Sequence, residues 1–308
     1  MAIPFFFLLL TVTIGVGFVL LNYLLSDLYN ESFSIKIGAS FFLGISSLIT
    51  CVSILAKIIG NSNYAAIVAI IIHLLIFLYH INSIKIIFHE VKKSEWIFGS
   101  IIILLVGILI LIYWMPSVDK LESYSTIGSL HSQRYAWISN YIKYCATIPV
   151  LGQNIGQSIL AYMVGLIFTD SPYLFLFLWL LMSQIFLGFL VFGFINLYIN
   201  NFKLSILGVL IFLFGNSALS LTRILTIDSG NPFVMNGYTD SLLGVASIFL
   251  LILYHNLAIK IYNYQFKTYF TIFILIVANY ISAPQNIIYL FSLIIIFLFY
   301  NFKKKARI

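Results

Sequence analysis

The sequence predicts an all-α fold, a polytopic membrane bundle of about nine to ten transmembrane helices with one re-entrant or interfacial polar segment. Of its 308 residues, 62% are hydrophobic and only 8% are charged, and the mean hydropathy is +1.09. Soluble domains carry roughly 25% charged residues, so a soluble fold of this size could not cover so much apolar surface. A membrane β-barrel needs alternating apolar and polar residues, and runs such as Ile101–Trp114 show no such alternation. Lipid is therefore the expected solvent.

About ten apolar runs follow one another, each near the roughly 20 residues that span a bilayer. No repeat or linker divides them, so residues 1–308 are expected to form a single transmembrane domain. The first run lacks a basic leader and a small-residue cleavage site, which predicts a retained helix rather than a signal peptide. The runs are Pro4–Leu25, Lys36–Ile59, Ala65–Phe88, Trp96–Trp114, Val150–Phe168, Tyr173–Tyr198, Leu204–Leu221, Ser241–Ile259, Thr268–Ile281 and Ile287–Phe302.

Lysines predict which loops face the cytoplasm, because Lys and Arg are enriched there. The loop around Lys92, the loop around Lys260 and the tail Lys303–Lys305 are the basic segments expected on that side. An odd number of runs separates the first two loops, so one run between them must fail to cross. Val150–Phe168 is the weakest candidate, because its first half is rich in amides. This topology places the C-terminus in the cytoplasm and the N-terminus outside.

Residues 115–170 are expected to form an extracytoplasmic loop that contains an amphipathic surface helix and a polar dipping segment. Helical periodicity covers Gln133–Cys145, and Trp137 on this helix suits the membrane surface. Ile148-Pro149 is expected to end the helix, because proline disfavours helix at the preceding residue. One predicted face carries Tyr135, Ile138, Ile142 and Cys145, and another carries Gln133, Asn140 and Lys143.

Candidate catalytic residues are Asp119 and Glu122, which follow the fourth apolar run at the expected water boundary. A carboxylate there could act as a general base, and the alternative is a solvated loop acid. His131 and Arg134 precede the amphipathic helix as candidate binding residues for a phosphate. Their alternative role is interfacial positioning against lipid headgroups.

Amides and a second arginine complete the candidate binding residues. Gln153, Asn154 and Gln157 lie in two similar triplets that begin at Gly152 and Gly156, and the amides could bond sugar hydroxyls. The glycine spacing equally suits close helix packing. Arg223, at the predicted outer end of its run, could hold a lipid phosphate or pair with Asp228. No residue pattern predicts a metal or cofactor site, and Cys51 and Cys145 are expected to be packing residues.

Segment Trp114–Leu187 resembles the GT-C superfamily of membrane glycosyltransferases. The resemblance rests on the order Asp119, Arg134-Tyr135-Ala136-Trp137-Ile138, Ile148-Pro149 and then Gly152–Ser158. Many members have an acid after a helix, a surface helix, an Ile-Pro-type break and a polar segment in this order. The Pro-Pro pair that is common in the polar segment of the family is replaced here by the Gly-Gln-Asn and Gly-Gln-Ser triplets.

The resemblance implies sugar transfer from a polyprenyl-phosphate-linked donor at the extracytoplasmic face of a bacterial inner membrane, as part of cell-envelope chemistry. The implied partners are membrane lipid and the lipid-linked donor, with no nucleic acid. Two alternatives are a transporter or flippase for a lipid-linked or small polar solute, and a non-catalytic membrane assembly subunit. Inverted repeats and intramembrane acids would favour transport, and neither is evident in the sequence.

Overall fold

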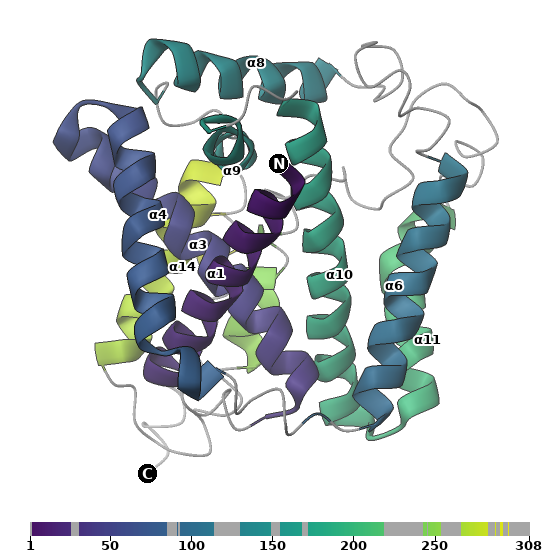
Figure 1. Ribbon diagram of the computed structural model, residues 1–308. Coiled ribbons are helices and arrows are strands. Elements are labelled where there is room, and N and C mark those ends of the chain that lie inside the picture. The colour runs from purple at the N-terminus through teal and green to yellow at the C-terminus, as the bar shows by residue number, and fades with distance from the viewer. Residues whose placement is uncertain are drawn as a thin grey trace.

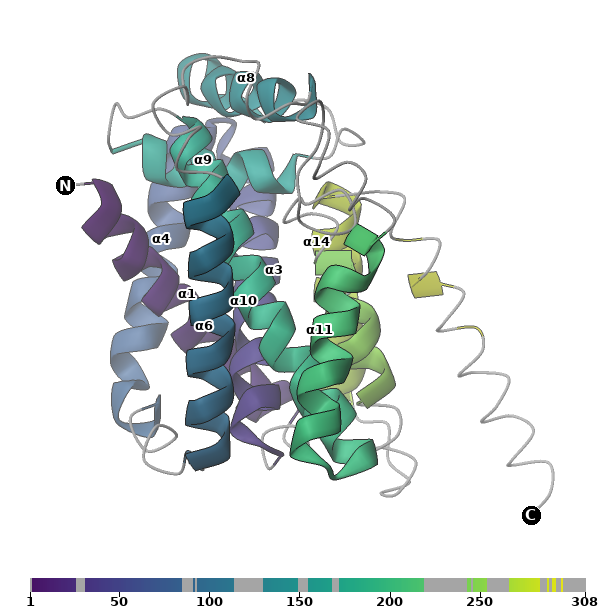
Figure 2. The same ribbon diagram turned by 90° about the vertical axis from the view of Figure 1, so that its right-hand side faces the viewer.

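All regular structure that the computed structural model describes is helical (Figures 1 and 2). The structure describes residues 2–25, 31–84, 91, 93–113, 130–148, 155–167, 172–218, 243–244, 246–253, 266–282, 287, 290–291 and 295. The helices are α1 (Ala2–Leu24), α3 (Phe33–Ile59), α4 (Ser62–Tyr79), α6 (Lys93–Tyr113), α8 (Leu130–Cys145), α9 (Gly156–Gly165), α10 (Pro172–Ile199), α11 (Phe202–Ala218) and α14 (Phe266–Ser282). A further helical segment covers residues 246–253.

Four of the described helices are long and apolar enough to cross a membrane, which fits a membrane protein. They are Ala2–Leu24, Phe33–Ile59, Ser62–Tyr79 and Leu174–Ile199. Two predicted runs are shorter as helices. Ala65–Phe88 gives α4, which ends at Tyr79 because His80 leaves the helical region with φ −101° and ψ 10°. Val150–Phe168 gives α9, whose ten residues span about 15 Å.

The α3–α4 hairpin is set by a short polar turn. Gly60 ends α3 with a φ of 73°, a left-handed conformation that glycine adopts without a steric penalty. Asn61 then caps α4, because its Oδ1 accepts hydrogen bonds from the backbone N–H groups of Asn63 and Tyr64 at 2.9 and 3.1 Å. The turn therefore fixes Ser62 as the first residue of α4 and places Ser62 and Asn63 in its first turn.

Helix α3 is the hub of the bundle, since it contacts α1, α4, α9, α10 and α14. Small residues allow these close approaches, as expected for helices that pack in lipid. A Cβ added at Gly38 would lie 2.8 Å from the backbone N of Leu190 and 2.8 Å from the carbonyl O of Phe186, both on α10. Helices α3 and α10 thus meet almost backbone to backbone.

Helix α8 lies across one end of the bundle, and α9 lies directly beneath it (Figures 1 and 2). Helices α1, α4 and α10 begin near this end and run away from it, whereas α3, α6, α11 and α14 run toward it. The backbone N–H of Ile155, which precedes α9, donates to Ile281 O in the last turn of α14 at 3.2 Å. The α8 end therefore gathers the ends of several helices around α9.

Candidate functional site

The exposed face of α8 is aromatic. Ala136, Ile138, Ser139 and Ile142 are buried against the bundle, while Trp137 and Tyr144 are 64% and 78% exposed. Trp137 also stacks on Tyr141, with ring centroids 5.5 Å apart. A helix covers the predicted residues Gln133–Cys145, and its first residue is Leu130.

One position of α8 differs from the prediction, and a second has a partner that the sequence does not indicate. Cys145 is exposed rather than packed with Ile138 and Ile142. Lys143 does not extend into water, because its Nζ donates to Gly165 O at 2.6 Å. Gly165 is the last residue of α9. Carbonyl groups at a helix C-terminus lack helical partners, and the macrodipole there favours a cation. The Lys143 ammonium group therefore gives one of these carbonyls a hydrogen-bond donor and stabilises the end of α9.

The chain leaves α8 through Ala146, whose φ of 51° ends the helix before the predicted Ile148-Pro149 break. Ala146 O accepts a hydrogen bond from the Ser62 backbone N–H at 2.8 Å. Ser62 Oγ donates to Ile142 O at 3.2 Å, and Asn63 Nδ2 donates to Lys143 O at 3.2 Å. The first turn of α4 thereby satisfies carbonyl groups at the C-terminal end of α8.

Tyr162 joins α9 to the same turn. Its hydroxyl donates to Asn63 Oδ1 at 2.5 Å. Burial raises the pKa of the Tyr162 hydroxyl to about 12, against a smaller opposite effect of a hydrogen bond with Ser62. The hydroxyl therefore keeps its proton and remains a donor at neutral pH. Ser62, Asn63, Lys143 and Tyr162 together form what we call the polar junction between α4, α8 and α9.

Helix α9 is buried over its whole length, Gly156–Gly165. Its polar residues are covered too: Gln157 is 2% exposed and Ser158 is 0% exposed. Gln157 Nε2 donates to Leu176 O of α10 at a long 3.5 Å. A ten-residue helix with buried amide and hydroxyl groups is unusual in an apolar bundle, since polar groups are buried at a free-energy cost unless they are bonded.

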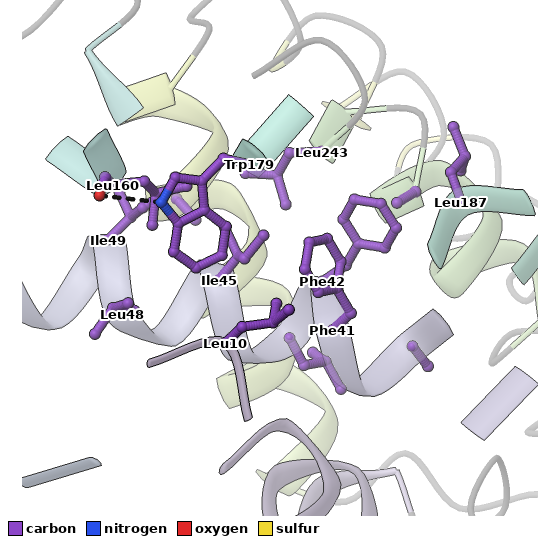
Figure 3. Close-up of a cluster of buried hydrophobic side chains, with 14 of the residues drawn as sticks. Leu10, Phe41, Phe42, Ile45, Leu48, Ile49, Leu160, Trp179, Leu187 and Leu243 are labelled. Atoms are coloured by element: carbon purple, nitrogen blue, oxygen red, sulfur yellow. Dashed lines mark hydrogen bonds between the residues drawn. The ribbon is translucent and has the colours of Figure 1, made fainter. Parts of the chain in front are cut away.

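Trp179 of α10 positions α9 from the other side (Figure 3). Its Nε1 donates to Leu160 O at 3.1 Å, and its ring is 0% exposed. Phe6 of α1 meets the ring edge-to-face with centroids 5.1 Å apart. The Trp179 side chain of α10 therefore contacts both α1 and α9.

The predicted site residues are only partly within the described structure. Gln157 lies on α9 as described above, and His131 and Arg134 lie in the first two turns of α8, with only their backbone described. The remaining candidates fall outside the described residues: Asp119, Glu122, Gln153, Asn154, Arg223 and Asp228. Within the described part of the chain, no three His, Cys, Asp or Glu side chains are grouped so that they could hold a metal ion.

Sequence reasoning missed the partners of the polar junction. Asn63 and Tyr162 are 99 residues apart in the chain, so no local spacing relates them. The only available signal was the Asn61-Ser62-Asn63 sequence itself, which is typical of a helix start. It does not indicate which groups the Ser62 hydroxyl and the Asn63 side-chain amide bind. The partner of Lys143 could not be predicted for the same reason, because its acceptor lies in another helix.

The Tyr162–Asn63 pair is expected to be energetically coupled. In a double-mutant cycle of Tyr162→Phe and Asn63→Ala, we expect a coupling free energy of about 1 kcal/mol, because each change removes the hydrogen bond between the Tyr162 hydroxyl and Asn63 Oδ1. Thermal unfolding in lipid or detergent measures it. Tyr64→Phe is the matched control, since Tyr64 is exposed and its hydroxyl change should matter little. Additive single effects would show that the two groups do not interact.

Comparison with family models, with curated proteins and with solved structures finds no match to this chain.

Proposed function

We propose that this chain is a polytopic membrane glycosyltransferase of the GT-C type that uses a polyprenyl-phosphate-linked sugar at the extracytoplasmic face of a bacterial inner membrane. The observation that carries the proposal is the stacking of α8 across the bundle end, directly over a short, buried α9 that carries Gln157 and Ser158 (Figure 1). The sequence segments that hold Asp119, Glu122, Gln153 and Asn154 adjoin these two helices in the chain.

The orientation follows from lysines at helix starts. Each of the helices that run toward α8 carries one in its first turn: Lys36 in α3, Lys93 in α6, Lys203 in α11 and Lys267 in α14. A cation is unfavourable at a helix N-terminus, where the macrodipole is positive, so local helix stability does not account for this pattern. The enrichment of lysine on the cytoplasmic side does account for it.

With that assignment, the end of the bundle opposite α8 faces the cytoplasm and α8 lies outside. The tail Lys303–Lys305 is assigned to the cytoplasm by the same rule. Helix α9 then begins and ends on the outer side, because about 15 Å of helix does not cross a hydrocarbon layer of roughly 30 Å. A short helix at that depth is supported only when protein surrounds it, as α8, α10 and α14 do here.

The proposed chemistry assigns roles to the candidate carboxylates, arginines and two of the amides. Asp119 or Glu122 takes the proton from the acceptor hydroxyl while its oxygen attacks the anomeric carbon of the donor sugar. The bond from that carbon to the phosphate oxygen breaks, and Arg134 or Arg223 stabilises the charge that develops on the departing lipid phosphate. Amides such as Gln153 and Asn154 orient sugar hydroxyls.

Donor consumption by purified protein in lipid tests the proposal, with a panel of polyprenyl-phosphate sugars and varied acceptors. Asp119→Asn or Glu122→Gln is expected to lower turnover by about 10² to 10⁴-fold while donor binding is retained, because a general base contributes about that much. Arg134→Ala should weaken donor binding. Glu31→Gln is the matched control, since this acid precedes α3 at the opposite end of the bundle.

Two results would contradict transferase activity. If wild-type protein binds a donor but consumes none with any acceptor, the chain acts in transport or assembly instead. If none of the donors binds, the lipid-linked substrate is wrong.

A further inference from the structure

Helix α3 carries a set of buried hydroxyl groups that have no hydrogen-bond partner. The side-chain oxygens of Ser40, Ser46, Thr50 and Ser53 are in this state, as is that of Ser282 at the end of α14. Several described hydroxyls on other helices bond the carbonyl four residues earlier, as Thr13 does to Leu9 O and Ser183 does to Trp179 O, both at 2.7 Å. The four hydroxyls of α3 lack this bond.

Three of these hydroxyls share one face of α3. Successive residues of a helix are rotated by about 100°, so the directions of its neighbours can be counted from Gly44, which faces Thr13 of α1. Gly38, which faces α10, then lies at about 120°, and Ser47, which bonds His73 of α4, lies at about 300°. Ser53, Ser46 and Thr50 lie at about 180°, 200° and 240°, between these two directions.

The sector with the three hydroxyls thus lies between the directions of α10 and α4. Helix α14 also contacts α3, and the directions of α1, α4 and α10 do not account for it. We assign it to this sector, and we call the surface that Ser46, Thr50 and Ser53 define on α3 the α3–α14 seam. Ser46 is 0% exposed, and Thr50 and Ser53 are each 7% exposed, so bulk solvent does not reach them.

The chemistry of the seam favours an uncharged ligand. Glu95, which is the one buried carboxylate among the described residues, lies toward the other end of α3 and accepts hydrogen bonds from Ser34 N and Ser34 Oγ at 3.0 and 3.2 Å. A bare cation in the seam would therefore lack a described counter-charge. Hydroxyls both donate and accept, and water satisfies such groups in buried sites by making two to four hydrogen bonds.

We propose that the α3–α14 seam is a hydration site, in which ordered water molecules bond Ser46, Thr50 and Ser53 inside the bundle. The bound water follows about two turns of α3. It also explains why three hydroxyls occur in a helix whose other buried residues are mostly apolar. The proposal does not depend on the transferase activity, because it concerns the interior of the bundle alone.

Removal of a single hydroxyl tests the proposal. Thr50→Val keeps the side-chain shape, so its effect reports the hydroxyl. If water bonds it, the melting temperature should fall by about 2 to 4 °C, and Thr50→Ser, which keeps the hydroxyl, should lower it less. Thr13→Val is the matched control and should have little effect, because Leu9 O keeps its backbone hydrogen bond. An unchanged or raised melting temperature for Thr50→Val would overturn the proposal, since a dry hydroxyl is better removed.

A measurement on the wild-type protein decides the matter if Thr50→Val fails to fold. Radiolytic hydroxyl-radical labelling modifies side chains that adjoin bound water. Leu43 lies one turn from Ser46 and Ser47 and should be modified, whereas Leu21 of α1 should be protected; both are 0% exposed. Equal protection of the two leucines would show that the seam is dry.

Discussion

Gly44→Ala is expected to destabilise the protein by about 3 kcal/mol or more, although it adds only one methyl group. A Cβ at Gly44 would overlap the carbonyl oxygen of Thr13 on α1, and a Cβ at Gly17 would overlap the carbonyl oxygen of Ser40 on α3. The two glycines thus make reciprocal contacts across one helix pair. Backbone atoms cannot move aside as a flexible side chain can, so α1 and α3 must separate. Because α3 contacts most of the bundle, the change should spread beyond this pair.

Thermal unfolding of the purified protein measures this effect, and the yield of monodisperse protein gives a second reading. The matched control is Gly165→Ala, because a Cβ at that helical glycine meets no atom within 4 Å. Alanine is the better helix former by about 1 kcal/mol, so Gly165→Ala should be neutral or slightly stabilising. Similar losses in the two variants would mean that α1 and α3 do not meet as closely as the structure has them.

The positions of the helices could be predicted from the sequence far better than their packing. Apolar runs located α1, α3 and α10 to within a few residues, since a span needs a continuous hydrophobic stretch. Their partners could not be predicted, because lipid-facing and buried residues are equally apolar and no periodic polar face marks the exterior. Gly44 is an example. A glycine within an apolar run indicates close helix packing, but nothing in the sequence indicates that Gly44 meets Thr13.

The candidate site shows the same division. A surface helix and a polar segment after it could be predicted from composition, and both are helices in the structure. That Gln157 would donate to Leu176 O, or that Lys143 would turn toward the end of α9, depends on which helix lies opposite. Hydrogen bonds between residues distant in sequence leave no local pattern, so spacing arguments cannot find them.

Trp179→Ala is expected to cost about 3 to 5 kcal/mol, the range for removal of a large buried aromatic side chain. The ring fills the space between α9 and α3, with Leu160, Ile45 and Ile49 around it (Figure 3). Trp179→Phe should cost less, about 1 to 2 kcal/mol, since a ring remains and mainly the donor to Leu160 O is lost. The difference between the two variants measures how much of the effect comes from the filled volume rather than from the hydrogen bond.

Trp137→Ala is the matched control for this series, because Trp137 is 64% exposed on α8 and its removal should change stability by less than about 0.5 kcal/mol. Helix α9 has no room to settle elsewhere, since α8 covers it and α14 bonds the residue before it. A cavity at Trp179 should therefore loosen α9 specifically. Hydrogen exchange of the α9 backbone amides should rise in Trp179→Ala by more than exchange in α11, which is not among the helices that pack against α9. A uniform rise across both helices would mean that the bundle unfolds as one unit and that Trp179 has no special relation to α9.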